Sequence, residues 1–98
     1  MSAKTSFHRL ARLELLDAID FYEEEEPGLG RAFLAIVEAG LKRIEQNPEA
    51  GAVVRGRVRS LHLRRFPYSI VYRHTSSVIR ILAVMNQRRR PFYWRQRS

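Results

Sequence analysis

The spacing of the apolar residues changes once along the chain, and this change limits the folds that the chain can adopt. Up to about residue 46, apolar residues recur with the period of an α-helix, and from residue 58 they alternate with polar residues as in β-strands. Neither a helical layer nor a sheet can bury its apolar side alone. The sequence therefore predicts an α+β fold in which helices cover one face of a sheet.

Two amphipathic helices are predicted in the first half, at residues 10–25 and 30–46, after a short edge strand at residues 5–8. The segment Pro27-Gly28-Leu29-Gly30 separates the helices, and Asn47-Pro48 ends the second one. Because the connection is so short, we expect the helices to form an antiparallel hairpin.

Three strands are predicted in the second half, at residues 58–66, 68–74 and 78–85, and short turns join them into an antiparallel sheet. Residues 49–56 are predicted to be a loop. The expected order is β-α-α-β-β-β, with the helical hairpin packed on the antiparallel sheet. Residues 1–98 are expected to form one domain that ends in a basic, aromatic tail at residues 86–98.

Charge is divided unequally between the two halves. Residues 1–56 contain all ten acidic residues and seven Lys or Arg, so their net charge is −3. Residues 57–98 contain eleven Arg and no acidic residue, so their net charge is +11. A segment with this charge has no anions of its own, and we expect it to face a polyanion or an acidic protein.

Several kinds of site and compartment are not expected. The chain has no cysteine, no signal-like apolar segment at its start and no run of about 18 apolar residues. We therefore expect a cytoplasmic protein without a membrane segment. The three histidines lack the spacing of metal ligands, so neither a metal nor another cofactor is predicted.

The basic residues of the strands and the tail are the candidate partner-binding residues, because arginine and aromatic side chains together are typical of binding hot spots. For the aromatic tail the alternative is that Phe92 and Trp94 fold back and cap the core. The candidates are Arg64, Arg65, Arg73, Arg80, Arg88, Arg89, Arg90, Tyr93, Trp94 and Arg95.

A set of motifs, in this order and at this spacing, resembles the ParE/RelE family of toxins from about Phe7 to Arg97. The ending in particular is similar to the ParE branch, which is known for plasmid stabilisation. The motifs are Tyr22, the turn at residues 27–30 followed by Phe33-Leu34, Asn47-Pro48, Phe66-Pro67-Tyr68 with Ile70 and Tyr72, Ile81-Leu82-Ala83-Val84, and Arg88-Arg89-Arg90-Pro91 with Tyr93-Trp94.

This resemblance implies a toxin of a type II toxin–antitoxin system that causes growth arrest unless a cognate antitoxin neutralises it. The antitoxin is expected to be acidic where it covers the toxin. The toxin is expected to bind operator DNA only indirectly, through the antitoxin. Members of the ParE branch inhibit DNA gyrase, whereas RelE-like members cut mRNA on the ribosome.

The residues favour the gyrase inhibitor, which is not an enzyme. Ribosome-dependent relatives carry basic residues where this chain has Ser60, His62 and Ser69. If the chain is nevertheless an mRNA endoribonuclease, His62, Arg88 and Tyr93 are its candidate catalytic residues. Asn86 stands where many ParE members have histidine, which leaves open a toxin that retains only antitoxin binding. A non-toxic basic nucleic-acid-binding module is a further alternative.

Overall fold

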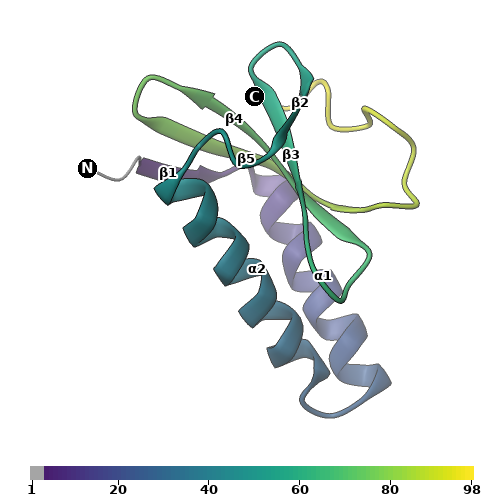
Figure 1. Ribbon diagram of the computed structural model, residues 1–98. Coiled ribbons are helices and arrows are strands. Elements are labelled where there is room, and N and C mark those ends of the chain that lie inside the picture. The colour runs from purple at the N-terminus through teal and green to yellow at the C-terminus, as the bar shows by residue number, and fades with distance from the viewer. Residues whose placement is uncertain (1–3) are drawn as a thin grey trace.

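The structure is a computed structural model, and it describes residues 4–98. A helical hairpin packs on a five-stranded sheet (Figure 1). The predicted α+β class and the packing of the hairpin on the sheet are confirmed. No helix within residues 4–98 is both long enough and apolar enough to span a bilayer. The elements in chain order are β1 (Lys4–Phe7), α1 (Arg9–Glu25), α2 (Leu29–Gln46), β2 (Ala52–Arg55), β3 (Val58–His62), β4 (Tyr68–Thr75) and β5 (Val78–Asn86).

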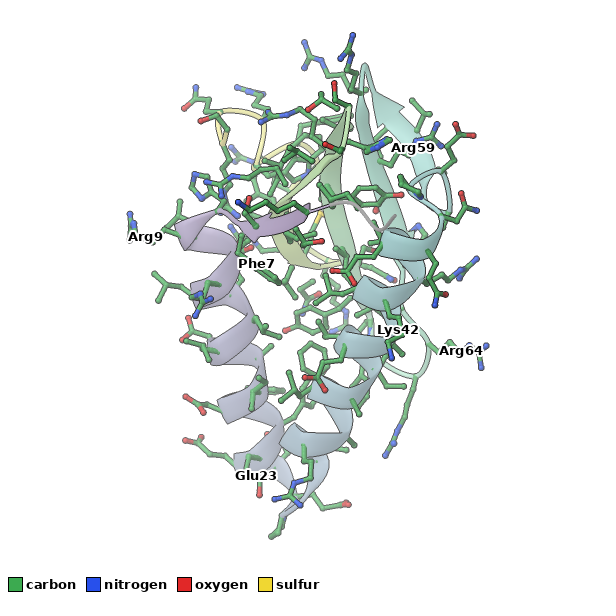
Figure 2. The ribbon with its side chains drawn as sticks, turned by 90° about the vertical axis from the view of Figure 1, so that its left-hand side faces the viewer. Phe7, Arg9, Glu23, Lys42, Arg59 and Arg64 are labelled. Atoms are coloured by element: carbon green, nitrogen blue, oxygen red, sulfur yellow. The ribbon has the colours of Figure 1, made fainter. Side chains whose placement is uncertain are left out.

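One carboxylate and two glycines determine the turn between α1 and α2. Glu23 accepts hydrogen bonds from the backbone N–H groups of Gly28 at 2.9 Å and Gly30 at 3.1 Å, so it satisfies amides at the start of α2. Figure 2 shows Glu23 at the closed end of the hairpin. A Cβ atom on Gly30 would lie 2.6 Å from the carbonyl oxygen of Ile19. Glycine at this position therefore allows the two helices to approach closely.

The sheet is mixed, with the strand order β1-β5-β4-β3-β2. The three pairs β2–β3, β3–β4 and β4–β5 are antiparallel, as predicted for β3, β4 and β5. Strand β1 differs, because it runs parallel to β5 with Lys4 opposite Val78. The predicted antiparallel sheet is thus confirmed for β3, β4 and β5 but does not extend to this edge, since the alternation of local residues carries no information about the direction of so distant a partner.

Strand β2 corrects a second prediction, because residues 52–55 belong to the segment that was expected to be a loop. Val53 and Val54 are both exposed, so no alternation of buried and exposed residues marks the strand. Gly56 adopts a positive φ of 55° in the turn to β3. The signal that could have identified this hairpin is a pair of β-branched residues just before a glycine turn.

The main core lies between the hairpin and the sheet. Phe33, Val37 and Ile44 of α2 form one buried cluster with Ile70 and Tyr72 of β4. The helical spacing of the α2 residues places them on the side of the helix that faces the sheet. The alternation along β4 places Ile70 and Tyr72 on the side of the sheet that faces the helices.

The opposite face of the sheet is covered in part by the tail. Trp94, which is only 4% exposed, forms a second cluster with Val71 of β4 and with Leu82 and Ala83 of β5. Strand β5 is therefore buried on both sides at its middle, which accounts for its nearly continuous apolar sequence.

Candidate partner-binding surface

Two turns lie side by side at one end of the sheet and bring five arginines together. The turn after β3 contains Arg64 and Arg65, and the segment after β5 contains residues 88–90, all arginine and all exposed. The backbone N–H of Gln87 donates to the carbonyl oxygen of Pro67 at 2.8 Å and joins the two turns. We call Arg64, Arg65, Arg88, Arg89 and Arg90 the arginine end. Figure 2 shows Arg64 pointing away from the body of the protein.

The arginine end has no acidic counterpart within the described chain. Among residues 4–98 there is a single ion pair, and it joins Arg97 to Glu14. The five guanidinium groups thus remain unneutralised within that part of the protein. Their positive charges add to one local field, because they come from two neighbouring turns.

The tail folds back onto the body instead of extending into solvent. Trp94 is buried against the sheet, as the core-capping alternative predicted, so Trp94 could contact a partner only if the tail moved. Phe92, for which the same alternative predicted burial, is exposed. Tyr93 is half-buried, and its hydroxyl donates to Glu14 Oε2 at 2.8 Å. Burial and this hydrogen bond raise the pKa of the Tyr93 phenol well above its usual range. Tyr93 therefore remains a neutral donor at physiological pH.

Of the three other predicted partner-binding residues, Arg73 and Arg80 lie apart from the arginine end, whereas Arg95 lines the same pocket as Arg90. Arg73 and Arg80 face each other across β4 and β5, near the far end of these strands. The guanidinium of Arg80 donates to Ser6 Oγ, to the carbonyl oxygen of Phe7 and to that of Ser98, so its hydrogen bonds are made within the chain. Arg95 is exposed in the tail. Partner contact by these residues stays a prediction.

His62 belongs to a small polar network beside the arginine end. Its Nδ1 atom lies 3.0 Å from Ser69 Oγ and 3.1 Å from Gln87 Nε2. The Gln87 amide also donates to the carbonyl oxygen of Tyr68 at 3.1 Å, which fixes its position. An amide N–H that points at Nδ1 favours the tautomer with its proton on Nε2. Only Nε2 of His62 is then left to meet another molecule.

The three residues named for ribonuclease chemistry are not joined into one catalytic arrangement. His62 and Arg88 lie near each other through Gln87, whereas the Tyr93 hydroxyl is bound to Glu14 on α1. Sequence reasoning missed Gln87 and Glu14 as organising residues. For Glu14 the only signal was a carboxylate one turn before the buried Ala18, at the border of the apolar stripe of α1.

The fold and this surface define a class of small, basic α+β protein in which a helical hairpin packs on a mixed sheet with an exposed arginine end. The family model described as the ParE toxin of the type II toxin–antitoxin system, parDE, matches residues 6–91. The chain belongs to this ParE toxin family.

Individual relatives agree with this assignment. The chain is 33% identical over 92 residues to Toxin ParE2 of Mycobacterium tuberculosis, strain CDC 1551 / Oshkosh, and equally to Toxin ParE2 of strain ATCC 25618 / H37Rv. In both cases the match covers 93% of this chain and 88% of the relative. A solved structure described as the chromosomal ParDE TA system from P. aeruginosa has a TM-score of 0.74 at 24% identity, covering 87% of this chain and 96% of that one. This structure supports the fold.

Proposed function

We propose that this ParE-type toxin acts in the cytoplasm by binding and inhibiting DNA gyrase, and that the arginine end makes the main contact. The observation that carries this proposal is the group of five exposed arginines without a carboxylate partner among residues 4–98. Arginine forks suit carboxylate and phosphate groups. A binding inhibitor needs no proton transfer, which fits the internal hydrogen bonds of His62 and Tyr93.

The test is a gyrase assay with the purified protein and a variant that lacks part of the arginine end. Arg88→Ser, Arg89→Ser and Arg90→Ser together should weaken the inhibition of supercoiling by about tenfold or more, because several charged contacts are lost at once. Substitution is preferable to deletion of the tail, because deletion would also uncover Leu82 and Ala83.

The matched control removes the same number of charges from elsewhere. Arg9, Arg12 and Arg31 are exposed on the two helices, and their replacement by serine should leave inhibition close to that of the unmodified protein. Equal losses in both triple variants would show that net charge alone matters. Absence of any effect of the unmodified protein on gyrase would refute the proposed target.

We further propose that a cognate antitoxin neutralises the toxin through an acidic segment. An acidic chain is the natural counterpart of the second half of this protein, which has eleven arginines and no acidic residue. Operator DNA would then be reached only through the antitoxin. If a short reading frame beside the toxin gene encodes this antitoxin, its co-expression should relieve growth arrest and yield a stable complex. A neighbour that neither binds the toxin nor relieves arrest would contradict this part of the proposal.

An mRNA endoribonuclease is the second candidate, favoured by one observation: His62 lies beside the arginine end, where RNA phosphates could bind. In this case, induction should produce codon-phased mRNA ends, and His62→Gln should abolish them. The internal hydrogen bond of Tyr93 to Glu14 makes this candidate weaker. Salt-sensitive DNA binding without growth arrest would instead favour a non-toxic nucleic-acid-binding module.

A further inference from the structure

A carboxylate far from the tail in sequence accepts three of the hydrogen bonds that hold the tail in place. The carboxylate of Glu14 on α1 accepts hydrogen bonds from both terminal nitrogens of Arg97. Nη1 lies 2.9 Å from Oε1, and Nη2 lies 3.0 Å from Oε2. The carboxylate also accepts the Tyr93 hydroxyl at 2.8 Å and the backbone N–H of Val84 at 3.1 Å. One side chain thus joins α1, β5 and the tail.

The bonds to Glu14 are shielded from water. The side chain of Glu14 is 17% exposed and that of Arg97 is 11% exposed. A second bond from Arg97 Nη1, to the carbonyl oxygen of Leu82 at 3.0 Å, ties the tail to β5 as well. A bidentate ion pair that is mostly shielded from solvent has a defined geometry, unlike an ion pair on the surface.

The same contacts reach the arginine end through the Tyr93 ring. The guanidinium carbon of Arg97 lies 4.9 Å from the centre of this ring, and that of Arg89 lies 4.1 Å from it. Arg89 is a member of the arginine end. Its position therefore depends on Tyr93, and the position of Tyr93 depends on Glu14.

The backbone of the tail does not favour this conformation on its own. Residues 87–98 form turns without a helix or strand. Phe92 adopts a positive φ of 62°, a region that aromatic residues rarely occupy. A strained backbone of this kind persists only where surrounding contacts hold it. The contacts available here are the burial of Trp94, the bonds to Glu14 and the hydrogen bonds that join Arg97 and Ser98 to β5.

We infer that Glu14 is a positioning residue for the toxic surface: it holds residues 91–97 against α1 and β5, so that the arginine end is presented to its target in one arrangement. This inference rests on the proposed function for the role of the arginine end. Without the carboxylate, the poorly exposed Arg97 loses its counter-charge, and the tail gains freedom that must be lost again on binding.

The experiment compares Glu14→Gln with Asp17→Asn. Asp17 is one turn further along α1, is exposed and accepts no hydrogen bond from the described residues, so it controls for the loss of one carboxylate. The chain has a single tryptophan, Trp94, which reports directly on the tail. Glu14→Gln should shift its emission to longer wavelengths and make it easier to quench with acrylamide, whereas Asp17→Asn should leave both unchanged.

The functional measurement uses the same two variants. Glu14→Gln should weaken gyrase inhibition by about tenfold or more, because the released residues must be ordered on binding, at a cost in conformational entropy. Asp17→Asn should inhibit like the unmodified protein. Far-ultraviolet circular dichroism should show the same secondary structure for all three proteins, so that a change in Trp94 emission reports on the tail and not on unfolding.

A second variant keeps the inference testable should Glu14→Gln fail to fold. Arg97→Gln breaks the same ion pair from the tail side and should have the same effects on Trp94 emission and on inhibition. Unchanged Trp94 emission in both variants would overturn the inference, as would an exposed Trp94 with full inhibition. If the unmodified protein does not inhibit gyrase, the proposed function fails, and Trp94 emission together with growth arrest still decides whether Glu14 positions the tail.

Discussion

The Tyr72 hydroxyl is buried in the main core and satisfies two backbone groups at once. It donates to the carbonyl oxygen of Pro48 at 2.7 Å and accepts from the backbone N–H of Gly51 at 2.9 Å. In this way β4 fixes the segment that leads from α2 to β2. Sequence alternation predicted that Tyr72 lies on one face of its strand, but not that its hydroxyl has these partners.

Tyr72→Phe should lower the free energy of unfolding by about 1–3 kcal/mol, because a buried amide and a partly buried carbonyl each lose a partner. Urea denaturation followed by circular dichroism would measure the change. Tyr68→Phe is the control, since its hydroxyl makes no hydrogen bond to any of residues 4–98, and it should change stability much less. A Tyr72→Phe protein as stable as the original would contradict the role of this hydroxyl.

His8 caps the start of α1, because its Nδ1 atom accepts from the backbone N–H of Leu10 at 3.0 Å. A protonated ring cannot accept this hydrogen bond. Burial lowers the pKa of His8 below its usual value of 6.5, and nearby guanidinium groups lower it further, whereas Glu14 opposes them. These guanidinium groups belong to Arg97, Arg80 and Arg9.

The stability that His8 contributes should therefore depend on pH. Below about pH 6.5 the unfolded chain binds more protons at His8 than the folded protein does. The contribution is complete above pH 6.5 and is lost as the pH falls below that value. We expect His8→Asn, which retains a capping side chain, to lose less stability than the unmodified protein between pH 7 and pH 5.5. Equal losses in thermal denaturation would disprove this.

At the scale of elements, the helical hairpin depends on the cap that Glu23 provides. Glu23→Ala should destabilise the protein by about 1 kcal/mol, because the amides of Gly28 and Gly30 lose their acceptor and a negative charge is removed from the start of α2. Glu24→Ala is the matched control, since Glu24 is exposed and caps nothing among the described residues. The midpoint of urea denaturation should fall for the first variant only.

The elements themselves could largely be predicted from the sequence. Both helices and three strands follow from apolar spacing, and their ends follow from local signals such as Gly28 and Pro48. Strand β2 was missed because its residues are all exposed. The direction of β1 was missed because its partner, β5, lies at the other end of the chain. Local patterns thus indicate which segments form strands, but not how an exposed or distant strand joins the sheet.

For the whole molecule, the acidic and basic residues remain mostly unpaired in the folded protein. The two halves do not neutralise each other, since residues 4–98 contain only the ion pair between Glu14 and Arg97. The sequence predicted this excess of arginine but not the place where it gathers. The arginine end is formed by two turns that the pairing of strands in the sheet brings together. It contacts Glu14 through Tyr93, although Glu14 and Tyr93 lie near opposite ends of the sequence.

Association with an acidic antitoxin should accordingly depend strongly on salt. The association rate should fall steeply as NaCl is raised above about 0.1 M, where the Debye length is about 10 Å, because long-range attraction is screened. The triple substitution of Arg88, Arg89 and Arg90 by serine should show a shallower dependence. Stopped-flow kinetics at several salt concentrations would measure both. A rate independent of salt would exclude electrostatic steering.

The pairing of the first strand with the last has a consequence for synthesis on the ribosome. Strand β1 is made first, but its partner β5 emerges only after nearly the whole protein has been translated. Until then β1 lacks a neighbouring strand, and Glu14 lacks Arg97. Contacts between such distant parts of a chain form late. The nascent protein therefore cannot complete its fold before Arg97 has left the ribosome, so the surface that depends on β5 and on the tail is assembled late in synthesis.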